Sequence, residues 1–356
     1  MGRELIDLYS DYLLCGSRQT TATGLSELTG GAISHDRITR FLSGEAMDGK
    51  TLWLKVKKIV RAYEHEEACL IFDDSVIPKP YMDENDIICW HWDHKENRSV
   101  KGMNLLSSFY TAQPGDMEVR IPIGYEIITK TERYIDPKDN KEKRRSEKTK
   151  NELMREMISA QITNRVKFRY ILADSWFSSN ENMKFIHKKR KKFILGLKEN
   201  RLAALSKQGR DAGHFERIDQ IEIPERQPTA AWLKDLDIPI LLYKQVFTNK
   251  DGTQGTRYLV TNDLEMSGGQ IETLYKKRWG VEEYHKSIKQ NASIGSSPAR
   301  TERTQSNHIF AAIYGYVKLE KIKMEQKINH FALKMMIYME SLKAAMRLIP
   351  EYVGAS

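Results

Sequence analysis

The sequence at positions 69–74 is Cys-Leu-Ile-Phe-Asp-Asp, a short apolar run that ends in two acidic residues. A run of this length and composition predicts a buried β-strand. A second run of the same kind, Phe-Arg-Tyr-Ile-Leu-Ala-Asp, occupies 168–174. An acid at the end of a buried strand is costly unless a metal ion or a basic partner offsets its charge. Strand-end acids also cap helices and form turns. Each acid taken alone could therefore be a functional residue or a purely structural one.

The pattern around these two runs predicts a mixed α/β core. In chain order the expected elements are strands at 69–74, 104–112 and 119–130, a helix at 146–164, a strand at 168–174, a helix at 180–190 and a strand at 192–197. A basic connector at 138–150 precedes the first of these helices. The order βββαβαβ is similar to that of a ribonuclease H-like five-stranded mixed sheet. In that fold the first and fourth strands are neighbours, which would bring the two acidic strand ends together.

The rest of the chain predicts an insertion and a helical C-terminal region. Residues 200–266 are expected to be β-rich, with strands at 221–223, 238–247 and 256–261, and helical patterns return at 271–290 and 307–349. The last segment carries regularly spaced apolar side chains: Phe331, Met335, Tyr338, Met339 and Leu342. We interpret them as intramolecular core, with a subunit interface as the alternative.

The N-terminal region, from about Glu4 to Tyr63, predicts helices joined by glycine-containing turns. Its stretch at 22–42 is typical of a helix-turn-helix unit, whose second helix would begin after a Ser34 cap. Such a helix enters the major groove of DNA, so the outward residues Arg37 and Arg40 are candidate DNA contacts. An ordinary helical bundle with a solvated basic face is the alternative.

Composition indicates a globular protein with an anionic partner. The 356 residues carry a formal net charge of +9, which favours binding to nucleic acid without proving it. The three cysteines are too few and too scattered for a disulfide framework or a four-ligand zinc site, and we expect them to be buried. No apolar run is long enough for a membrane helix, and the acidic N-terminus is unlike a signal peptide. We therefore expect a cytoplasmic, nucleoid-associated protein with no membrane partner.

The residues Tyr275, Arg278, Glu282, Lys286 and Lys289 recur at intervals of three or four. This spacing predicts that they share one face of a helix. An acid between basic residues can form a helical salt-bridge ladder. It can also bind a metal ion while its basic neighbours hold phosphates.

Four of these residues fit the Tyr-x2-Arg-x3-Glu-x6-Lys box of bacterial insertion-sequence DDE transposases. That family is a cut-and-paste class with a β-strand insertion ahead of the catalytic Glu. Ile71–Ser75 resembles the first Asp segment of the family, and Leu172–Phe177 resembles the second. The resemblance extends from about Leu70 to Gln290, in order and with plausible separations.

The resemblance implies that Asp74, Asp174 and Glu282 are the catalytic and metal-binding triad. Asp73 competes with Asp74 for the first place, because adjacent residues on a strand face opposite sides. Asp74 is preferred because the hydroxyl residue Ser75 follows it, although the family more often has Thr there.

The resemblance also implies the cofactor and the partners. Two divalent ions would assist phosphodiester cleavage and strand transfer, with Mg²⁺ as the expected ion and Mn²⁺ as a substitute, because both prefer oxygen ligands. Arg278, Lys286 and Lys289 would bind DNA phosphates, and Tyr275 would contact the same backbone. Double-stranded DNA, at the element ends and at the target, would be held by a homodimer.

These inferences divide the chain into a helical DNA-binding region at 1–66, the first part of the core at 67–199, the β-rich insertion at 200–266, a core helix with Glu282 at 267–300, and C-terminal helices at 301–356. Two alternatives remain. One is a ribonuclease H-like nuclease that hydrolyses DNA without joining it. The other is a non-catalytic DNA-binding regulator derived from a transposase, against which the intact acids and the intact box argue.

Overall fold

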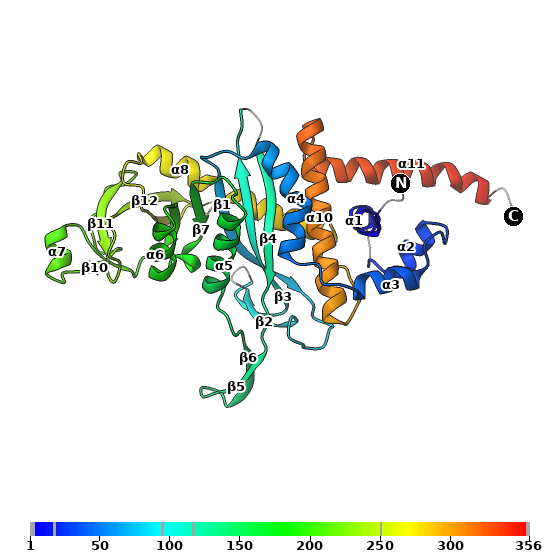
Figure 1. Ribbon diagram of the computed structural model, residues 1–356, viewed down its shortest axis with the longest axis horizontal. Helices are drawn as coiled ribbons and strands as arrows, with labels where there is room; N and C mark the ends of the chain where they lie inside the picture. The colour runs from blue at the N-terminus through cyan, green and yellow to red at the C-terminus, as the bar shows by residue number, and fades with distance from the viewer. Residues whose placement is uncertain (1–3, 17–18, 94–95, 116–117, 250, 354–356) are drawn as a thin grey trace.

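A mixed sheet forms the centre of the molecule (Figure 1). The computed structural model describes residues 4–16, 19–93, 96–115, 118–249 and 251–353. Its strands are β1 (Cys69–Pro78), β2 (Cys89–Asp93), β3 (Arg98–Ala112), β4 (Val119–Ile127), β5 (Glu132–Asp136), β6 (Lys141–Arg145), β7 (Tyr170–Ala173), β8 (Lys192–Leu197), β9 (Leu202–Ala204), β10 (Glu216–Arg217), β11 (Thr229–Leu233), β12 (Ile240–Thr248) and β13 (Gln254–Thr261).

Eleven of the described strands join in one sheet, in the order β10-β9-β11-β12-β13-β8-β7-β1-β3-β2, with β4 paired to β3. The predicted neighbours β1 and β7 pair in parallel, with Phe72 opposite Ala173. The five strands β4-β3-β1-β7-β8 form the ribonuclease H-like core, so the predicted fold class is confirmed. The sheet is wider than five strands because β2 adds to one edge and strands of the insertion add to the other.

Helices cover the sheet and continue beyond it. They are α1 (Leu5–Cys15), α2 (Ala22–Leu28), α3 (His35–Ser43), α4 (Gly49–Tyr63), α5 (Lys150–Thr163), the short 3₁₀ helix η1 (Ser175–Phe177), α6 (Asn180–Lys188), α7 (Lys207–Asp211), α8 (Gly268–Lys276), α9 (Trp279–Gln290), α10 (Glu302–Gln326) and α11 (His330–Val353). Helices α4 and α10 pack on β4, α5 packs on β3 and β4, and α9 packs on β1. This packing brings α9, with Glu282, to the strand that carries Asp73 and Asp74.

The N-terminal helices follow the sequence prediction closely. The Ser34 hydroxyl caps α3 by accepting a hydrogen bond from the Arg37 backbone N–H at 3.3 Å. Ile38 and Leu42 are buried, whereas Arg37 and Arg40 are exposed. The amphipathic pattern of this helix therefore decides which side chains reach solvent. The prediction that all cysteines are buried was wrong for Cys15, which is exposed on α1.

The C-terminal prediction was wrong in two respects. The segment 307–349 is not one helix, because Lys327 adopts a left-handed conformation (φ 57°) that ends α10. The apolar side chains of α11 are not core either, since those of Phe331, Met335, Tyr338, Met339 and Leu342 are exposed. Helix α11 projects away from the sheet and lies beside the N-terminal helices (Figure 1). It is tied to α1 by Lys334, whose ammonium donates to the carbonyl oxygens of Leu14 and Gly16.

Candidate active site

Asp73 and Asp174 occupy corresponding positions on neighbouring strands. Because Phe72 is opposite Ala173 in the parallel β1–β7 pair, the next residue on each chain is an aspartate. Strand β7 ends at Ala173, and the Asp174 side chain caps η1 by accepting a hydrogen bond from the Trp176 N–H at 2.9 Å. The paired strands thus bring two acids, about 100 residues apart in sequence, side by side in the middle of the sheet. Strand β1 continues to Pro78, so Asp73 and Asp74 lie within the strand and not at its end, where the sequence prediction placed them.

The Asp73 carboxylate is largely buried among charged groups. Its Oδ2 lies 3.9 Å from Arg278 Nη1 and 3.8 Å from His285 Nδ1. Burial raises the pKa of Asp73 to about 7; Arg278 opposes this shift, and the charges of Asp174 and Glu282 add to it. A carboxyl group with this environment gains most from a nearby cation.

Asp74 has a different environment. Its Oδ2 accepts hydrogen bonds from Lys150 Nζ at 2.7 Å and from Asn104 Nδ2 at 2.8 Å. Asp74 is nevertheless near the other acids, because its charge acts on Asp174. Burial raises the pKa of Asp174, the charge of Asp74 raises it further, and Arg278 opposes the shift. The Asp74 carboxylate already accepts hydrogen bonds from two protein donors. The Asp73 carboxylate instead lies beside Arg278, next to the helix that carries Glu282. The geometry favours Asp73 over the predicted Asp74 as the first acid of the site.

Arg278 connects the acids of β1 and α9. Its Nη1 lies 3.5 Å from Glu282 Oε1, one helical turn away, and 3.9 Å from Asp73 Oδ2. Its side chain is 17% exposed and that of Glu282 is 22% exposed, so water screens the cluster only in part. One guanidinium therefore holds two carboxylates of like charge close together.

Comparison with known families agrees with this geometry. A family model described as a transposase DDE domain matches residues 135–317, and one described as a DDE superfamily endonuclease matches residues 2–220. Each match spans more than half of the chain. The chain belongs to the DDE transposase family. Among curated individual proteins no match is found.

The sequence predicted that the residues of the Tyr-Arg-Glu-Lys box lie on one continuous helix. In this DDE protein they are divided between two helices, α8 and α9. Lys277 and Arg278 separate α8 from α9, and the amides of both donate to carbonyl oxygens three residues earlier, as in a 3₁₀ turn. Tyr275 is buried, and its hydroxyl donates to the Ala173 carbonyl oxygen at 3.5 Å. Tyr275 therefore fixes α8 to the strand that precedes Asp174.

Lys289 of the box and the neighbouring Lys286 are both exposed on α9. Lys289 and Lys286 line a hollow together with Trp279 and Glu282. Lys286 Nζ also lies 5.0 Å from the centre of the Phe331 ring of α11. Both lysines can reach an anionic ligand in this hollow, on the Glu282 side of the acids.

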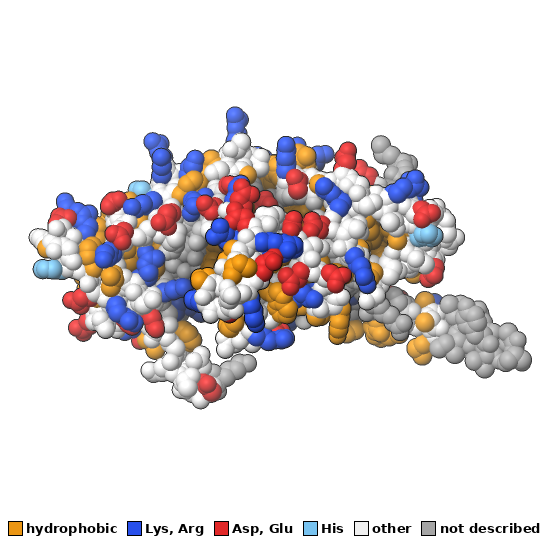
Figure 2. Space-filling model, turned by 90° about the horizontal axis from the view of Figure 1, so that it is seen from below, with side chains coloured by type: hydrophobic (Ala, Val, Ile, Leu, Met, Phe, Trp, Pro, Cys, Tyr) orange, Lys and Arg blue, Asp and Glu red, His pale blue; other side chains and the backbone are white. Residues whose placement is uncertain are grey.

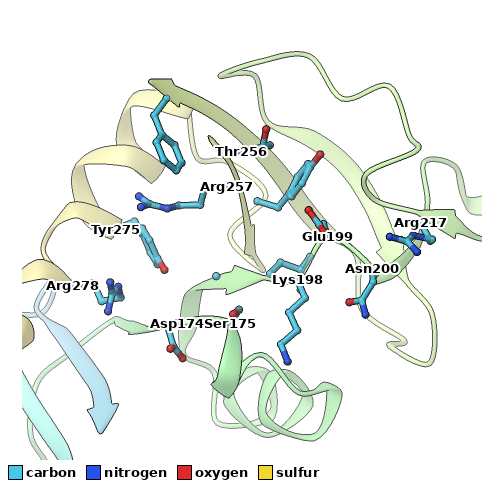
Figure 3. A pocket seen from close by; sticks show the side chains of 14 residues that line it. Asp174, Ser175, Lys198, Glu199, Asn200, Arg217, Thr256, Arg257, Tyr275 and Arg278 are labelled. Carbon is cyan, nitrogen blue, oxygen red and sulfur yellow. The ribbon is translucent and has the colours of Figure 1, made fainter. Parts of the chain in front are cut away.

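A second hollow opens on the Asp174 side (Figure 3). Tyr275 and Arg278 lie on one side of Asp174, and Lys198 and Asn200 lie on the other. Further lining comes from the insertion, through Phe247, Thr256, Arg257 and Tyr258. Tyr258, the aromatic residue of this insertion strand, is only 7% exposed, so it serves mainly as packing.

Gly196 allows these elements to approach closely. A Cβ atom at this position would lie 2.8 Å from the Ser175 amide nitrogen and 3.2 Å from the Asp174 carbonyl carbon. Sequence reasoning did not identify Gly196, because a glycine within a strand gives no sign of what lies beside it. Asp73, Lys150 and His285 were likewise not assigned a role in the site, since only the folded sheet shows which acid faces α9.

DDE-type endonucleases generally use divalent metal ions, and the donor set here fits that chemistry. The candidate ligands are carboxylates, which Mg²⁺ and Mn²⁺ prefer. Burial, together with neighbouring acids, raises the pKa of Asp73 and of Asp174, so a cation bound there would stabilise their charged forms. Within the described residues, no three acid, histidine or cysteine side chains are grouped closely enough to form a ready-made metal cage.

The charges of this DDE protein are not gathered into one basic patch on the face seen from below. Lys and Arg side chains alternate there with Asp and Glu (Figure 2). Many are paired, as in the β5–β6 hairpin, where Arg133 lies 2.9 Å from Glu142 and Arg145 lies 2.7 Å from Glu132. Basic residues of the connector predicted at 138–150 are thus paired mainly with acids of neighbouring segments, as Arg145 is with Glu132 and Lys148 is with Glu156. None of the helices in the described part of the chain is both long and apolar enough to cross a membrane.

Proposed function

We propose that this chain is a metal-dependent transposase that cuts DNA at the terminal inverted repeats of an insertion sequence and joins the freed 3′ ends to target DNA. The observation that carries the proposal is the meeting of Asp73, which lies within β1, and Asp174, which directly follows β7, with Glu282 joined to Asp73 through Arg278. Membership of the DDE family supplies the reaction class.

We assign the triad to Asp73, Asp174 and Glu282, and give Asp74 a supporting role. Two divalent ions, Mg²⁺ or Mn²⁺, would supply the activation of a water or 3′ hydroxyl and the stabilisation of the leaving oxygen. Arg278 keeps Asp73 and Glu282 close to each other despite their like charge. The Trp176 amide orients Asp174, and Lys150 with Asn104 orients Asp74. Arg278, Lys286 and Lys289 offer positive charge to the DNA backbone.

The remaining regions are proposed to recognise and pair the element ends. Residues 1–66 would bind the repeats through α3, because Arg37 and Arg40 are exposed on that helix while its apolar side is buried. The core would comprise 67–199 and 267–300, interrupted by the insertion at 200–266, with the C-terminal helices at 301–356 supporting a dimer. Loss of repeat binding on combined Arg37→Ala and Arg40→Ala substitution is the expected result in a gel-shift assay, and unchanged binding would remove α3 from this role. Binding to chromosomal DNA would associate the protein with the nucleoid.

The test of the active site compares four variants on duplex DNA that carries the flanking inverted repeats, with Mg²⁺ present. We expect Asp73→Asn, Asp174→Asn and Glu282→Gln each to lower the cleavage rate by more than about 100-fold, because each removes a metal-binding charge. Asp74→Asn is the matched control and should retain activity to within about tenfold, since its position is held by hydrogen bonds that an amide can partly keep.

Each outcome of this comparison decides an assignment. Loss of cleavage in Asp74→Asn with retention in Asp73→Asn would restore Asp74 as the first acid. Full activity of Glu282→Gln would end the assignment of the box to catalysis and place the third acid elsewhere, whereas a wild-type protein that binds the repeats but does not cleave them would be better described as a DNA-binding regulator. A strand-transfer assay separates the two enzyme classes, because joined products longer than the input fragment require transposition, whereas a plain nuclease gives only shortened products.

A further inference from the structure

The first residue of α11 is buried between two other helices. His330 is 7% exposed, although most of the residues that follow it in α11 are exposed. Its Nδ1 lies 3.0 Å from the Ser287 hydroxyl of α9, and its Nε2 lies 3.0 Å from Glu320 Oε2 of α10. One imidazole ring thus connects three helices, one of which carries Glu282.

The side chains around this ring form a directed chain of polar contacts. Asn291 Nδ2 donates to Ser287 Oγ at 3.1 Å, which leaves the Ser287 O–H to donate to His330 Nδ1. With Nδ1 as an acceptor, Nε2 carries the proton that faces the Glu320 carboxylate. All four side chains are at most 7% exposed, so water competes little for these contacts.

A serine, a histidine and an acid in this order also occur in hydrolases, where the serine is a nucleophile. Here Ser287 lies inside α9, so the neighbouring amide groups are used by the helix and cannot form an oxyanion hole. Ser287 is also only 2% exposed. The arrangement is therefore suited to holding helices in place and not to attacking a substrate.

Helix α9 needs such a contact because its beginning is weakly held. The helix starts directly after the turn at Lys277 and Arg278, and the Arg278 side chain makes no capping hydrogen bond to it. Glu282 lies in the first turn of α9, and Ser287 follows it by about 7.5 Å along the helix axis. A helix this short is stiff, so a contact that fixes Ser287 also fixes the direction of Glu282.

Aromatic contacts between the same helices add to this anchor. The His330 ring packs edge to face on Tyr316 of α10, with ring centres 4.9 Å apart, and Tyr316 packs in the same way on Tyr284 of α9 at 4.8 Å. Tyr284 stacks on Phe109 of β3 at 5.2 Å. The contacts of His330 thus continue through α9 to the strand that pairs with β1, where Asp73 lies.

We infer that His330 is a positioning residue for Glu282: its hydrogen bond with Ser287 holds α9 at the place and rotation at which Glu282 faces the acids of the sheet. The inference rests on the proposed function, because that function makes Glu282 a catalytic acid. The contact with Glu320 has a different effect, since it joins α11 to α10 and stabilises the fold. The two ring nitrogens can therefore be tested separately.

Two substitutions separate the nitrogens. In His330→Asn the amide oxygen lies close to the place of Nδ1 and can accept from Ser287, whereas in His330→Gln the amide nitrogen lies close to the place of Nε2 and can donate to Glu320. We expect His330→Gln to lower the rate of Mg²⁺-dependent single-turnover cleavage by about 10- to 100-fold, since a misplacement of up to about 1 Å has effects of this size. His330→Asn should keep the rate to within about threefold, because it keeps the bond to Ser287.

The order of the two variants should reverse in urea unfolding. His330→Asn loses the contact with Glu320 and should unfold at a lower urea concentration than His330→Gln, which keeps it. An activity loss that only followed a loss of stability would give the same order in both measurements. Hydrogen exchange in EDTA gives a readout without cleavage: amides of α9 should exchange faster in His330→Gln than in the wild type, and those of α4 should not.

Two further variants complete the test. Ser287→Ala removes the other partner of the same bond while keeping good helix propensity in α9. It should slow cleavage as much as His330→Gln does, and the double variant should be no slower than either, as expected for one shared interaction. Asn329→Ala is the matched control, because Asn329 Oδ1 only caps α11 by accepting from the Ala332 N–H at 2.8 Å. It should cleave at the wild-type rate to within about twofold.

Wild-type rates in His330→Gln and in Ser287→Ala would overturn the inference and leave the transposase activity standing. Equal losses in His330→Gln and His330→Asn, or an equal loss in Asn329→Ala, would overturn it as well, because the effect would then belong to the docking of α11 as a whole. Absence of cleavage by the wild type would instead contradict the proposed function. In that case unchanged exchange of α9 in His330→Gln would still exclude the anchor.

Discussion

At the scale of single residues, the site depends on which side chain each strand presents to its neighbour. Asp73 and Asp74 are adjacent in sequence, yet Asp73 lies beside Arg278 and His285 while Asp74 binds Lys150 and Asn104. The alternation of a strand made it certain that only one of the two could face α9. It could not decide which one, because that choice is made by the twist and pairing of the folded sheet.

Gly196 gives the first prediction at this scale. Gly196→Ala places a methyl group 2.8 Å from the Ser175 amide nitrogen, so the turn that carries Asp174 must move. We expect the Mg²⁺-dependent cleavage rate to fall by more than about tenfold and the free energy of unfolding to fall by about 1–3 kcal/mol, as for overpacking elsewhere. Single-turnover cleavage and urea unfolding measure the two effects.

The matched control for this prediction is Gly269→Ala in the first turn of α8. No heavy atom lies within 4 Å of a Cβ built there, so the change should be harmless or slightly stabilising. Equal rates for Gly196→Ala and wild type would show that close approach of β8 to the Asp174 turn is not needed for catalysis.

At the scale of elements, the sequence predicted the helices and strands in which buried apolar residues form a continuous run or recur at regular intervals. Strands β1, β7 and β8 were predicted because their apolar runs are short and end in polar residues. The β5–β6 hairpin was missed because it is held by pairs of opposite charge across the two strands, such as Lys143 with Asp136, and not by an apolar face. Strand β2 was missed for a related reason, since its exposed Trp90 and Trp92 obscure the alternation.

The insertion and the helix of the box also show that sequence patterns miss features that depend on contacts between distant parts of the chain. Strands β12 and β13 were predicted nearly at their observed bounds, whereas the strand expected at 221–223 was wrong and β11 was not foreseen. The break between α8 and α9 falls on Lys277 and Arg278, both with helical backbone angles and good helix propensity. Packing of Tyr275 against Ala173 accompanies the break, and this contact is between elements far apart in sequence.

The junction of α10 and α11 yields a prediction on pH dependence. Glu320 of α10 is 1% exposed, and its carboxylate lies 3.0 Å from His330 Nε2 of α11 and 3.0 Å from Lys323 Nζ. Burial raises the pKa of Glu320, but hydrogen bonds and charges from His330 and Lys323 outweigh burial, so the pKa is lowered. Stability from this group is therefore present above the pKa of the unfolded chain, about 4.3, and is lost as the pH falls through the lower value of the folded chain.

We expect Glu320→Gln to lower the free energy of unfolding by about 1–3 kcal/mol at pH 7, because the amide leaves its buried partners incompletely paired. The difference between variant and wild type should shrink as the pH falls below about 4. Glu325→Gln is the control, since Glu325 is exposed and lies 3.9 Å from Lys321. Urea unfolding at several pH values measures both, and a constant difference across the pH range would contradict the assigned pairing.

At the scale of the whole molecule, the exposed apolar side of α11 is the feature that the rest of the chain does not explain. The helix projects beside the N-terminal helices (Figure 1). The side chains of Met335, Tyr338 and Met339 are each 45% exposed or more. Exposed apolar surface of this kind marks a binding surface more often than chance. A transposase must also hold two element ends together, so a second copy of the chain is the partner that its proposed function requires.

The last prediction concerns this partner. If α11 pairs with its counterpart in a second copy, charged substitutions on its apolar side should prevent assembly, because buried charges without partners are costly. We expect the combined Met335→Glu and Met339→Glu variant to be monomeric by sedimentation velocity, with repeat DNA present, under conditions where the wild type forms a dimer on DNA. Hydrolysis at a single end should survive while coupled joining of two ends falls, since only joining needs both copies. The combined Lys184→Glu and Lys188→Glu variant of α6 carries the same number of added acids on an exposed helix outside the proposed repeat-binding region, and should still dimerise. A Met335→Glu and Met339→Glu variant that remains a dimer on DNA would exclude α11 as the interface and leave the pairing of ends to another surface.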